Sequence, residues 1–223
     1  MRSEQSKSGD IVHPGDRPES GTSRWTMLAS VARPWVARRS ESATFRGIVD
    51  GTLDDRVMRT WVEQDFLYLQ VYGRVLARLA WSAPDRHIAT IIEVAHDAIG
   101  REVDQIRALG QLFDAELDAC SMNAACRAYT DYLIEHSADY QHGIVAVAPC
   151  MIGFAAIGIT LERPDEPRYR RWIDTYSVGD FQQTTRRFGS VVDDLDLDDA
   201  TAVAIFEDGM RHEAAMWRGA GGD

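Results

Sequence analysis

The sequence predicts an all-α fold, a bundle of seven or eight helices around one buried pocket. Apolar residues recur every three or four positions along most of the chain, which is the spacing of one face of an α-helix. The alternation of apolar and polar residues that marks a half-buried strand is almost absent. With 223 residues, 45% of them hydrophobic, the chain is long and apolar enough to bury a sizeable core.

The chain is expected to divide into a tail and one domain. Residues 1–23 are rich in Ser, Gly, Pro and charged side chains, a composition typical of disorder. Residues 24–220 are expected to form a single all-α domain. Its first helix has an apolar stripe made of Trp25, Leu28, Val31, Trp35 and Val36. A short helical turn follows, and Thr52 is expected to cap the next helix, which ends near Pro84.

Six further helices are expected after that point. Residues 88–112 form an amphipathic helix, and Ser121 is the expected N-cap of the helix after it. Residues 138–161 are apolar nearly all round, so this helix is expected to be central in the bundle. Two short helices and a last long one, capped by Asp198, are expected over about 168–176, 178–195 and 198–218.

The net charge and the number of cysteines indicate which partners and which cellular location to expect for the protein. A net charge of −11 disfavours nucleic acid or an anionic membrane surface as the main partner. No apolar stretch reaches the roughly 18 residues that a membrane span needs. Cys120, Cys126 and Cys150 are odd in number and form no CxxC pair, so no complete disulfide framework is expected. A reducing, cytoplasmic location fits this pattern.

Two carboxylates fall on the apolar faces of their helices. Asp65 shares a stripe with Trp61 and Tyr68, and Glu213 shares one with Trp217. A buried carboxylate is costly unless it is paired or hydrogen-bonded, so each acid has either a structural partner or a function. The structural alternative is a Tyr or Arg partner for Asp65 and a salt bridge to an Arg of a neighbouring helix for Glu213.

Cys150 is the candidate nucleophile. It follows Pro149 in an almost wholly apolar run, and a proline inside a helix bends the axis and frees a carbonyl. Cysteine is intrinsically very nucleophilic, although a buried Cys that acts as a small hydrophobe is the plainer alternative. Several phenols also fall on inward faces: Tyr68, Tyr72, Tyr129 and Tyr176. A thiol, two acids and several phenols are the groups that acid-assisted nucleophilic displacement needs.

A di-iron oxygenase is a competing hypothesis. Glu93 and His96 form an ExxH pair on a helix, and helical di-iron proteins use two such pairs with further glutamates. Only one pair is present, so a solvated pair is the structural alternative. The remaining histidines form no ligand pattern, and no metal site is expected.

Six segments, taken in order, resemble the thiaminase II family, also called TenA, which has a haem-oxygenase-like helical fold. The resemblance covers about residues 24–218. The matching segments are Phe45-x-x-Ile48 with Asp50-Gly51-Thr52-Leu53, Gln64-Asp65-Phe66-Leu67-Tyr68, Ala128-Tyr129-Thr130-Asp131-Tyr132-Leu133, Pro149-Cys150 with Ile157-Gly158, Tyr169-x-x-Trp172-Ile173-x-x-Tyr176-x-x-x-x-Phe181, and Glu213-x-x-x-Trp217.

The resemblance implies a hydrolase of thiamin salvage, without a metal or an organic cofactor. Its substrate would be 4-amino-5-aminomethyl-2-methylpyrimidine, which it would convert to the hydroxymethylpyrimidine, with slower cleavage of thiamin. A homotetramer, or a homodimer, is implied. Cys150 would be the nucleophile that attacks the methylene carbon. Asp65 would hold the ring nitrogen and the exocyclic amine, and Glu213 would protonate the leaving group. The implied substrate-binding residues are Asp65, Tyr68, Tyr129, Phe154 and Tyr176.

The sequence departs from the family pattern after Cys150. Family members usually have a Trp and then a Tyr where this chain has Ile152 and Phe154. The missing hydroxyl at Phe154 removes a hydrogen bond that the resemblance directs to the pyrimidine, and such a loss can change the choice of substrate. A second hypothesis is therefore a protein of this fold that binds another small aromatic amine, with altered catalysis or none.

Overall fold

A computed structural model describes residues 22–177 and 179–223. Within these ranges every regular element is a helix, which confirms the all-α prediction. The helices are α1 (Arg24–Ser40), α2 (Ala43–Val49), α3 (Asp55–Ser82), α4 (Asp85–Asp97), the π-helical η1 (Ala98–Glu102), α5 (Val103–Leu112), α6 (Ala124–His136), α7 (Tyr140–Thr160), α8 (Pro167–Ser177), α9 (Asp180–Asp193) and α10 (Asp199–Gly219). The short α2 apart, and with α4, η1 and α5 taken as one continuous rod, eight long helices remain among the described residues. The expected disordered tail falls outside these ranges, except for residues 22 and 23.

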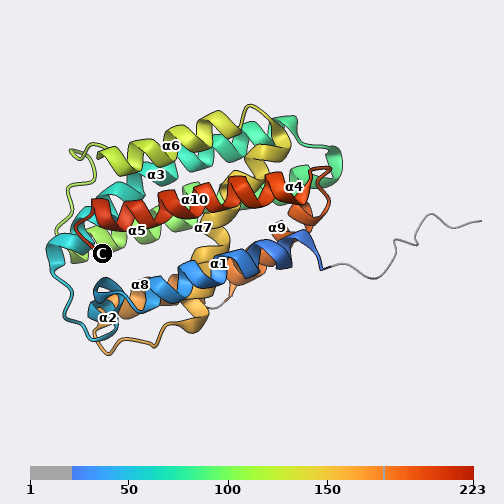
Figure 1. Ribbon diagram of the computed structural model, residues 1–223. Helices are drawn as coiled ribbons and strands as arrows, with labels where there is room; N and C mark the ends of the chain where they lie inside the picture. The colour runs from blue at the N-terminus through green and yellow to red at the C-terminus, as the bar shows by residue number, and fades with distance from the viewer. Residues whose placement is uncertain (1–21, 178) are drawn as a thin grey trace, which may run out of the picture.

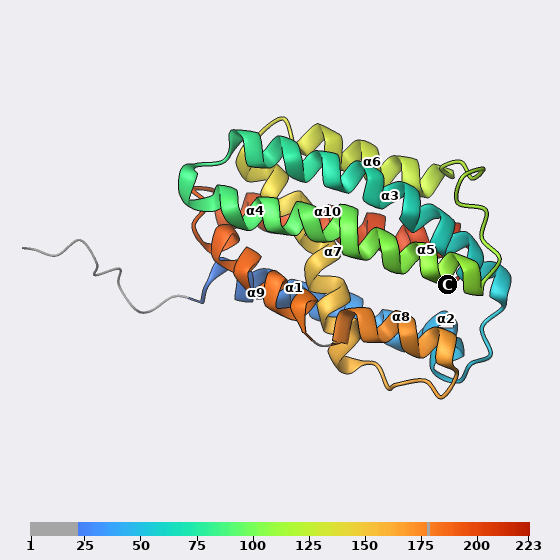
Figure 2. The ribbon, with the colours of Figure 1, turned by 180° about the vertical axis from the view of Figure 1, so that it is seen from behind.

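Helix α7 runs through the middle of the bundle. In Figure 1 it passes from the side of α3 and α6 to the side of α8 and α9, across the direction of the other long helices. Figure 2 shows the same crossing from behind. By length and composition α7 could cross a membrane, but 83% of its most apolar window is buried inside the bundle. It is therefore the central helix that the sequence predicts.

Two helices begin later than the sequence suggests. Asp54, not Thr52, is the N-cap of α3, and its carboxylate accepts a hydrogen bond from the backbone N–H of Arg56. Thr52 belongs to the preceding loop, where its N–H donates to the carbonyl of Gly47. Helix α6 begins after Asn123, not after Ser121. Each observed N-cap is an Asp or Asn side chain that lies two residues after the predicted Thr or Ser. All four residue types are good N-caps, so the sequence did not distinguish between them.

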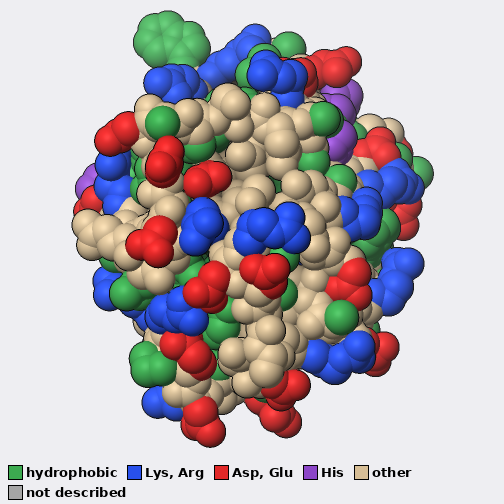
Figure 3. All heavy atoms as spheres, turned by 90° about the vertical axis from the view of Figure 1, so that its left-hand side faces the viewer, with side chains coloured by type: hydrophobic (Ala, Val, Ile, Leu, Met, Phe, Trp, Pro, Cys, Tyr) green, Lys and Arg blue, Asp and Glu red, His purple; other side chains and the backbone are tan. Residues whose placement is uncertain are grey.

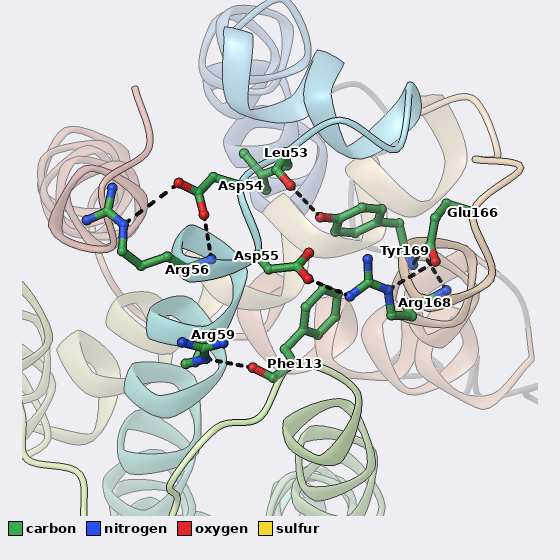
Figure 4. A network of polar contacts seen from close by, with 9 residues as sticks. All are labelled: Leu53, Asp54, Asp55, Arg56, Arg59, Phe113, Glu166, Arg168 and Tyr169. Atoms are coloured by element: carbon green, nitrogen blue, oxygen red, sulfur yellow. Dashed lines mark hydrogen bonds and ion pairs between the residues drawn. The ribbon is translucent and has the colours of Figure 1, made fainter.

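A polar network ties the start of α3 to the start of α8 (Figure 4). Arg168 donates to Asp55 at 2.9 Å, and the hydroxyl of Tyr169 donates to the carbonyl of Leu53 at 3.0 Å. These contacts fix the angle at which α3 enters the bundle. Because α3 carries Asp65, the network also sets the position of one wall of the candidate site.

The exposed charges are mixed in sign. Figure 3 shows acidic and basic side chains interspersed over one face, without a continuous basic area on that face. Several charged side chains of the described residues are paired, for example Arg163 with Asp174 at 3.0 Å and Arg101 with Asp180 at 2.7 Å. Such exposed pairs contribute little to stability, and the described core is held mainly by apolar packing.

Candidate functional site

Six of the seven candidate residues line one small buried cavity. They come from α3, α6, α7 and α10, and they are Asp65, Tyr68, Tyr129, Cys150, Phe154 and Glu213. Trp61, Met216 and Trp217 complete the wall, and we call this space the aromatic cavity. Its volume is about 10 Å³, which is room for about one water molecule. The seventh candidate, Tyr176, lies behind Phe154, with 4.7 Å between the ring centroids.

Close packing of α7 against α10 brings the thiol and one acid together. A methyl group at Gly209 would lie 2.6 Å from Cγ of Pro149, and one at Gly153 would lie 2.8 Å from Oε1 of Glu213. Both glycines therefore let the two helices approach more closely than alanines could. The approach places the Glu213 carboxylate against α7 one turn after Cys150.

Glu213 forms a buried ion pair with Arg39 of α1. Arg39 Nη1 lies 2.5 Å from Glu213 Oε1, and the two side chains are only 6% and 4% exposed. This is the salt bridge that the sequence offered as the structural alternative. Burial raises the pKa of Glu213, and the Arg39 charge acts against that rise. The second carboxylate oxygen, Oε2, is buried without a hydrogen-bond partner, so the pairing leaves one oxygen free for chemistry.

Asp65 has no such partner. No hydrogen bond or ion pair engages its carboxylate among the described residues, so the structural alternative of a Tyr or Arg partner is not found there. Burial, followed by the charges of Glu102 and Glu213, raises the pKa of Asp65 well above its ordinary value. The raised pKa favours the protonated form of this carboxyl group, which can donate one hydrogen bond and accept another.

The Cys150 thiol lies among carboxylates and phenols. Burial raises its pKa, and the nearby charges of Glu102, Glu213 and Asp65 raise it further. The hydroxyls of Tyr68 and Tyr129 are buried without hydrogen-bond partners. Their ring centroids are 4.8 Å apart. The thiol is thus protonated at rest and needs a base before it can act as a nucleophile.

Cys150 also lines a second small cavity. Its lining residues are Tyr72, Val94, Asp97, Glu102, Cys150, Met151, Phe181 and Thr184, and its volume is also about 10 Å³. We call it the acidic cavity. The sequence analysis missed Glu102. The signal was present, because Glu102 falls on the apolar stripe of Ile91, Ala95, Ala98, Ile106 and Leu109.

The sequence analysis also missed Arg39. It falls on the buried face of α1 with Leu28, Ala32 and Val36, so its helical position was a readable signal. The sequence could not show which acid pairs with Arg39, because Glu213 lies 174 residues further along the chain.

The Glu93 and His96 pair does not form a metal site. Glu93 is paired with Arg187, and the His96 side chain is 83% exposed. Among the described residues no group of three or more His, Cys, Asp or Glu side chains is arranged to hold a metal ion. The geometry gives the di-iron hypothesis no support.

The fold and the site together define a haem-oxygenase-like helical protein with a thiol and carboxylates enclosed in the bundle. The chain belongs to the TENA/THI-4/PQQC family, whose sequence model matches residues 33–221. A TenA homologue from P. horikoshii superimposes with a TM-score of 0.82 at 22% identity, over 89% of this chain and 98% of that one. Haem oxygenase-1 from Synechocystis gives a TM-score of 0.63 at 14% identity, over 88% of this chain and 91% of that one. These two likenesses show the fold.

Two curated relatives are similar in sequence over part of the chain. An aminopyrimidine aminohydrolase from Halalkalibacterium halodurans is 30% identical over 151 residues, which are 62% of this chain and 66% of that protein. The thiamine biosynthesis multifunctional protein ThiED from Corynebacterium efficiens is 35% identical over 142 residues. That match covers 61% of this chain but only 19% of the ThiED protein.

Proposed function

We propose that this protein is an aminopyrimidine hydrolase of thiamin salvage. It would convert 4-amino-5-aminomethyl-2-methylpyrimidine and water to the hydroxymethylpyrimidine and ammonia. The observation that carries the proposal is the aromatic cavity, where Cys150, Asp65 and Glu213 meet among aromatic rings. The similarity to an aminopyrimidine aminohydrolase supports it. The cytoplasmic location and the homotetramer or homodimer that the resemblance implies belong to the same proposal.

Asp65 would orient the pyrimidine. Its neutral carboxyl donates a hydrogen bond to a ring nitrogen and accepts one from the exocyclic amine. The hydroxyls of Tyr68 and Tyr129 face each other and the thiol without a hydrogen bond of good geometry, so they can bond to the substrate. A polar heterocycle would thus satisfy buried groups that are otherwise costly to leave unpaired.

Glu213 would carry the proton through both half-reactions. The Arg39 charge favours its carboxylate form, in which it would take the proton of the Cys150 thiol. The sulfur then forms a C–S bond to the methylene carbon while the C–N bond breaks, and Glu213 gives its proton to the departing nitrogen. In the second half-reaction Glu213 takes a proton from water. The oxygen forms a C–O bond, the C–S bond breaks, and the thiolate recovers the proton. General acid–base catalysis of this kind contributes about 10²–10⁴ in rate.

The test is an incubation of the purified protein with the aminomethylpyrimidine and, separately, with thiamin. Mass spectrometry for the hydroxymethylpyrimidine follows. Product is expected from the wild type and not from Cys150→Ala, whereas Cys120→Ala, whose thiol lies outside both cavities, keeps full activity. Full activity in Cys150→Ala would exclude the covalent mechanism.

A binder without this catalysis is the second candidate, and Phe154 favours it. Phe154 lines the aromatic cavity and has no hydroxyl to direct at the ring, whereas Ile152 lines neither cavity. This candidate predicts calorimetric binding of an aromatic amine with no product after long incubation. Any Cys150-dependent product rules it out.

A further inference from the structure

Glu102 is placed beside the thiol by an irregularity in its helix. The segment Ala98–Glu102 is π-helical between two regular α-helices, and such segments occur frequently at functional sites. A methyl group at Gly73 of α3 would lie 2.0 Å from Cγ2 of Ile99. The π-helical segment can therefore lie close against α3 because residue 73 has no side chain.

Among the polar groups that line the acidic cavity, Glu102 is a hydrogen-bond acceptor whose carboxylate has no partner within the described residues. Asp97 already accepts from Arg101 at 2.7 Å and from Thr184 at 3.0 Å. The Tyr72 hydroxyl donates to the carbonyl of Val147 at 3.2 Å. In contrast, no hydrogen bond or ion pair engages the Glu102 carboxylate within the described ranges. Burial raises its pKa to about 7, even though the adjacent Arg101 charge lowers it.

The position of Cys150 connects this acceptor to the proposed substrate. Cys150 lines both the aromatic and the acidic cavity. A substrate whose ring lies in the aromatic cavity and whose methylene lies at the thiol can extend its next atom into the acidic cavity. In the aminomethylpyrimidine that atom is the amine nitrogen.

We propose that the acidic cavity is the subsite for the protonated aminomethyl group of the substrate, and that the Glu102 carboxylate accepts its hydrogen bonds. The inference rests on the proposed function, because it takes the pyrimidine ring to occupy the aromatic cavity. Glu102 would then be a residue that determines specificity for the leaving group.

The chemistry of the cavity suits an ammonium group. An alkyl amine, like the side chain of lysine, is protonated at neutral pH and donates hydrogen bonds. An ammonium group is also about as large as the one water molecule for which the cavity has room. The thiazolium of thiamin has a positive charge but no N–H to donate. A site built to accept hydrogen bonds from a group discriminates strongly against an analogue without it.

The proton balance holds for a substrate bound in this form. The C–N bond breaks with its electron pair on nitrogen, and ammonia leaves with the three hydrogens that it brought. With the amine already protonated, Glu213 is not needed as an acid while the C–N bond breaks. The proton that it took from the Cys150 thiol passes afterwards to the released ammonia, which departs as ammonium. The second half-reaction with water is unchanged.

The test measures binding in the full chain with Cys150→Ser, which prevents turnover. Calorimetry compares the aminomethylpyrimidine with 4-amino-2,5-dimethylpyrimidine, which has the same ring but no amine on the methyl carbon. The amine is expected to bind at least about tenfold more tightly, as a charge-assisted hydrogen bond implies. Adding Glu102→Gln is expected to remove this preference and to leave the affinity for the dimethyl compound within about twofold.

The matched control is Asp104→Asn, an exposed acid on the same rod, which is expected to keep the preference. Glu102→Asp is a second variant, which keeps the charge on a shorter side chain and is expected to keep part of the preference. A preference that survives in Glu102→Gln overturns the inference, as do equal affinities for the two compounds in Cys150→Ser, while the proposed function stands. Failure of both compounds to bind overturns the proposed function itself.

Discussion

Oε1 of Glu213 lies 2.8 Å from the place that a Cβ atom on Gly153 would occupy. A real Cβ atom is essentially never found so close to an oxygen, so this position excludes every residue except glycine unless the carboxylate moves. The same oxygen is also held by the ion pair with Arg39. Its position is therefore defined by one cation and one missing methyl group.

Replacing Gly153 with alanine should displace Glu213 from the thiol. A misplacement of about 1 Å in a catalytic group can cost about 100-fold in rate, so a loss of that order in kcat is expected. Steady-state kinetics on the aminomethylpyrimidine measures it. Ile159→Ala, a truncation at a 68% exposed position of the same helix, should leave kcat unchanged. Wild-type kcat in Gly153→Ala would show that Glu213 has no role in the rate-limiting step.

Replacing Arg39 with methionine should destabilise the protein by about 3–5 kcal/mol at neutral pH, because it leaves a buried carboxylate unpaired. Without the cation, the pKa of Glu213 in the folded state rises further above that in the unfolded state. The folded state then binds the proton more tightly, so the unfolding free energy of Arg39→Met should fall as pH rises. Urea unfolding at pH 5 and pH 8 measures the difference.

The double variant Arg39→Met/Glu213→Gln is the control for that experiment. With the carboxylate removed, it should be more stable than Arg39→Met alone at pH 8 and should lose most of the extra pH dependence. Equal stability of the single variant at the two pH values would contradict the assignment of the shift to Glu213.

Replacing Phe154 with tyrosine should strengthen pyrimidine binding. The ring already lies in the wall of the aromatic cavity, so the added hydroxyl would offer the pyrimidine one more hydrogen bond. One such bond is worth about 1 kcal/mol, so KM for the aminomethylpyrimidine should fall roughly fivefold. Ile152→Val should leave KM unchanged, because Ile152 lines neither cavity. A higher KM in Phe154→Tyr would mean that the ring edge faces away from the substrate.

Replacing Glu102 with glutamine should stabilise the protein above about pH 7. The pKa of Glu102 is about 7 in the folded protein, against an ordinary value of 4.5. The folded state therefore binds this proton more tightly, and Glu102 lowers stability as pH rises from about 4.5 to about 7. The charged or titratable groups around it are Arg101, Asp97, Asp65, Tyr72, Cys150 and Tyr176. Urea unfolding of both proteins at pH 5 and pH 8 should show the gap only at the higher pH.

The sequence was informative about which acids lie inside the bundle. Asp65 and Glu213 occupy apolar stripes, and the structure buries both, at 7% and 3% exposure. Glu102 has the same helical position and is partly buried, but it was not among the predicted site residues. Periodicity thus locates buried acids well, provided that every helix is read for them.

Helical periodicity could not predict which helices pack against each other. Arg39 and Glu213 meet because α1 and α10 pack together, and nothing local to either helix encodes that contact. The π-helical segment was also unpredictable, because one extra residue in a turn barely disturbs an apolar stripe. The second cavity depends on both kinds of information, so only the folded structure could show it.

Each of the two cavities at Cys150 has room for about one water molecule, whereas small-molecule sites have volumes of roughly 300–1,000 Å³. A pyrimidine can therefore enter only when the helices or the aromatic side chains around the thiol move apart. The opening of the cavity, rather than diffusion, then limits the rate at which the pyrimidine binds. The association rate constant should therefore be low and should rise steeply with temperature. The same tight closure would keep bulk water and foreign electrophiles from the thiol between turnovers.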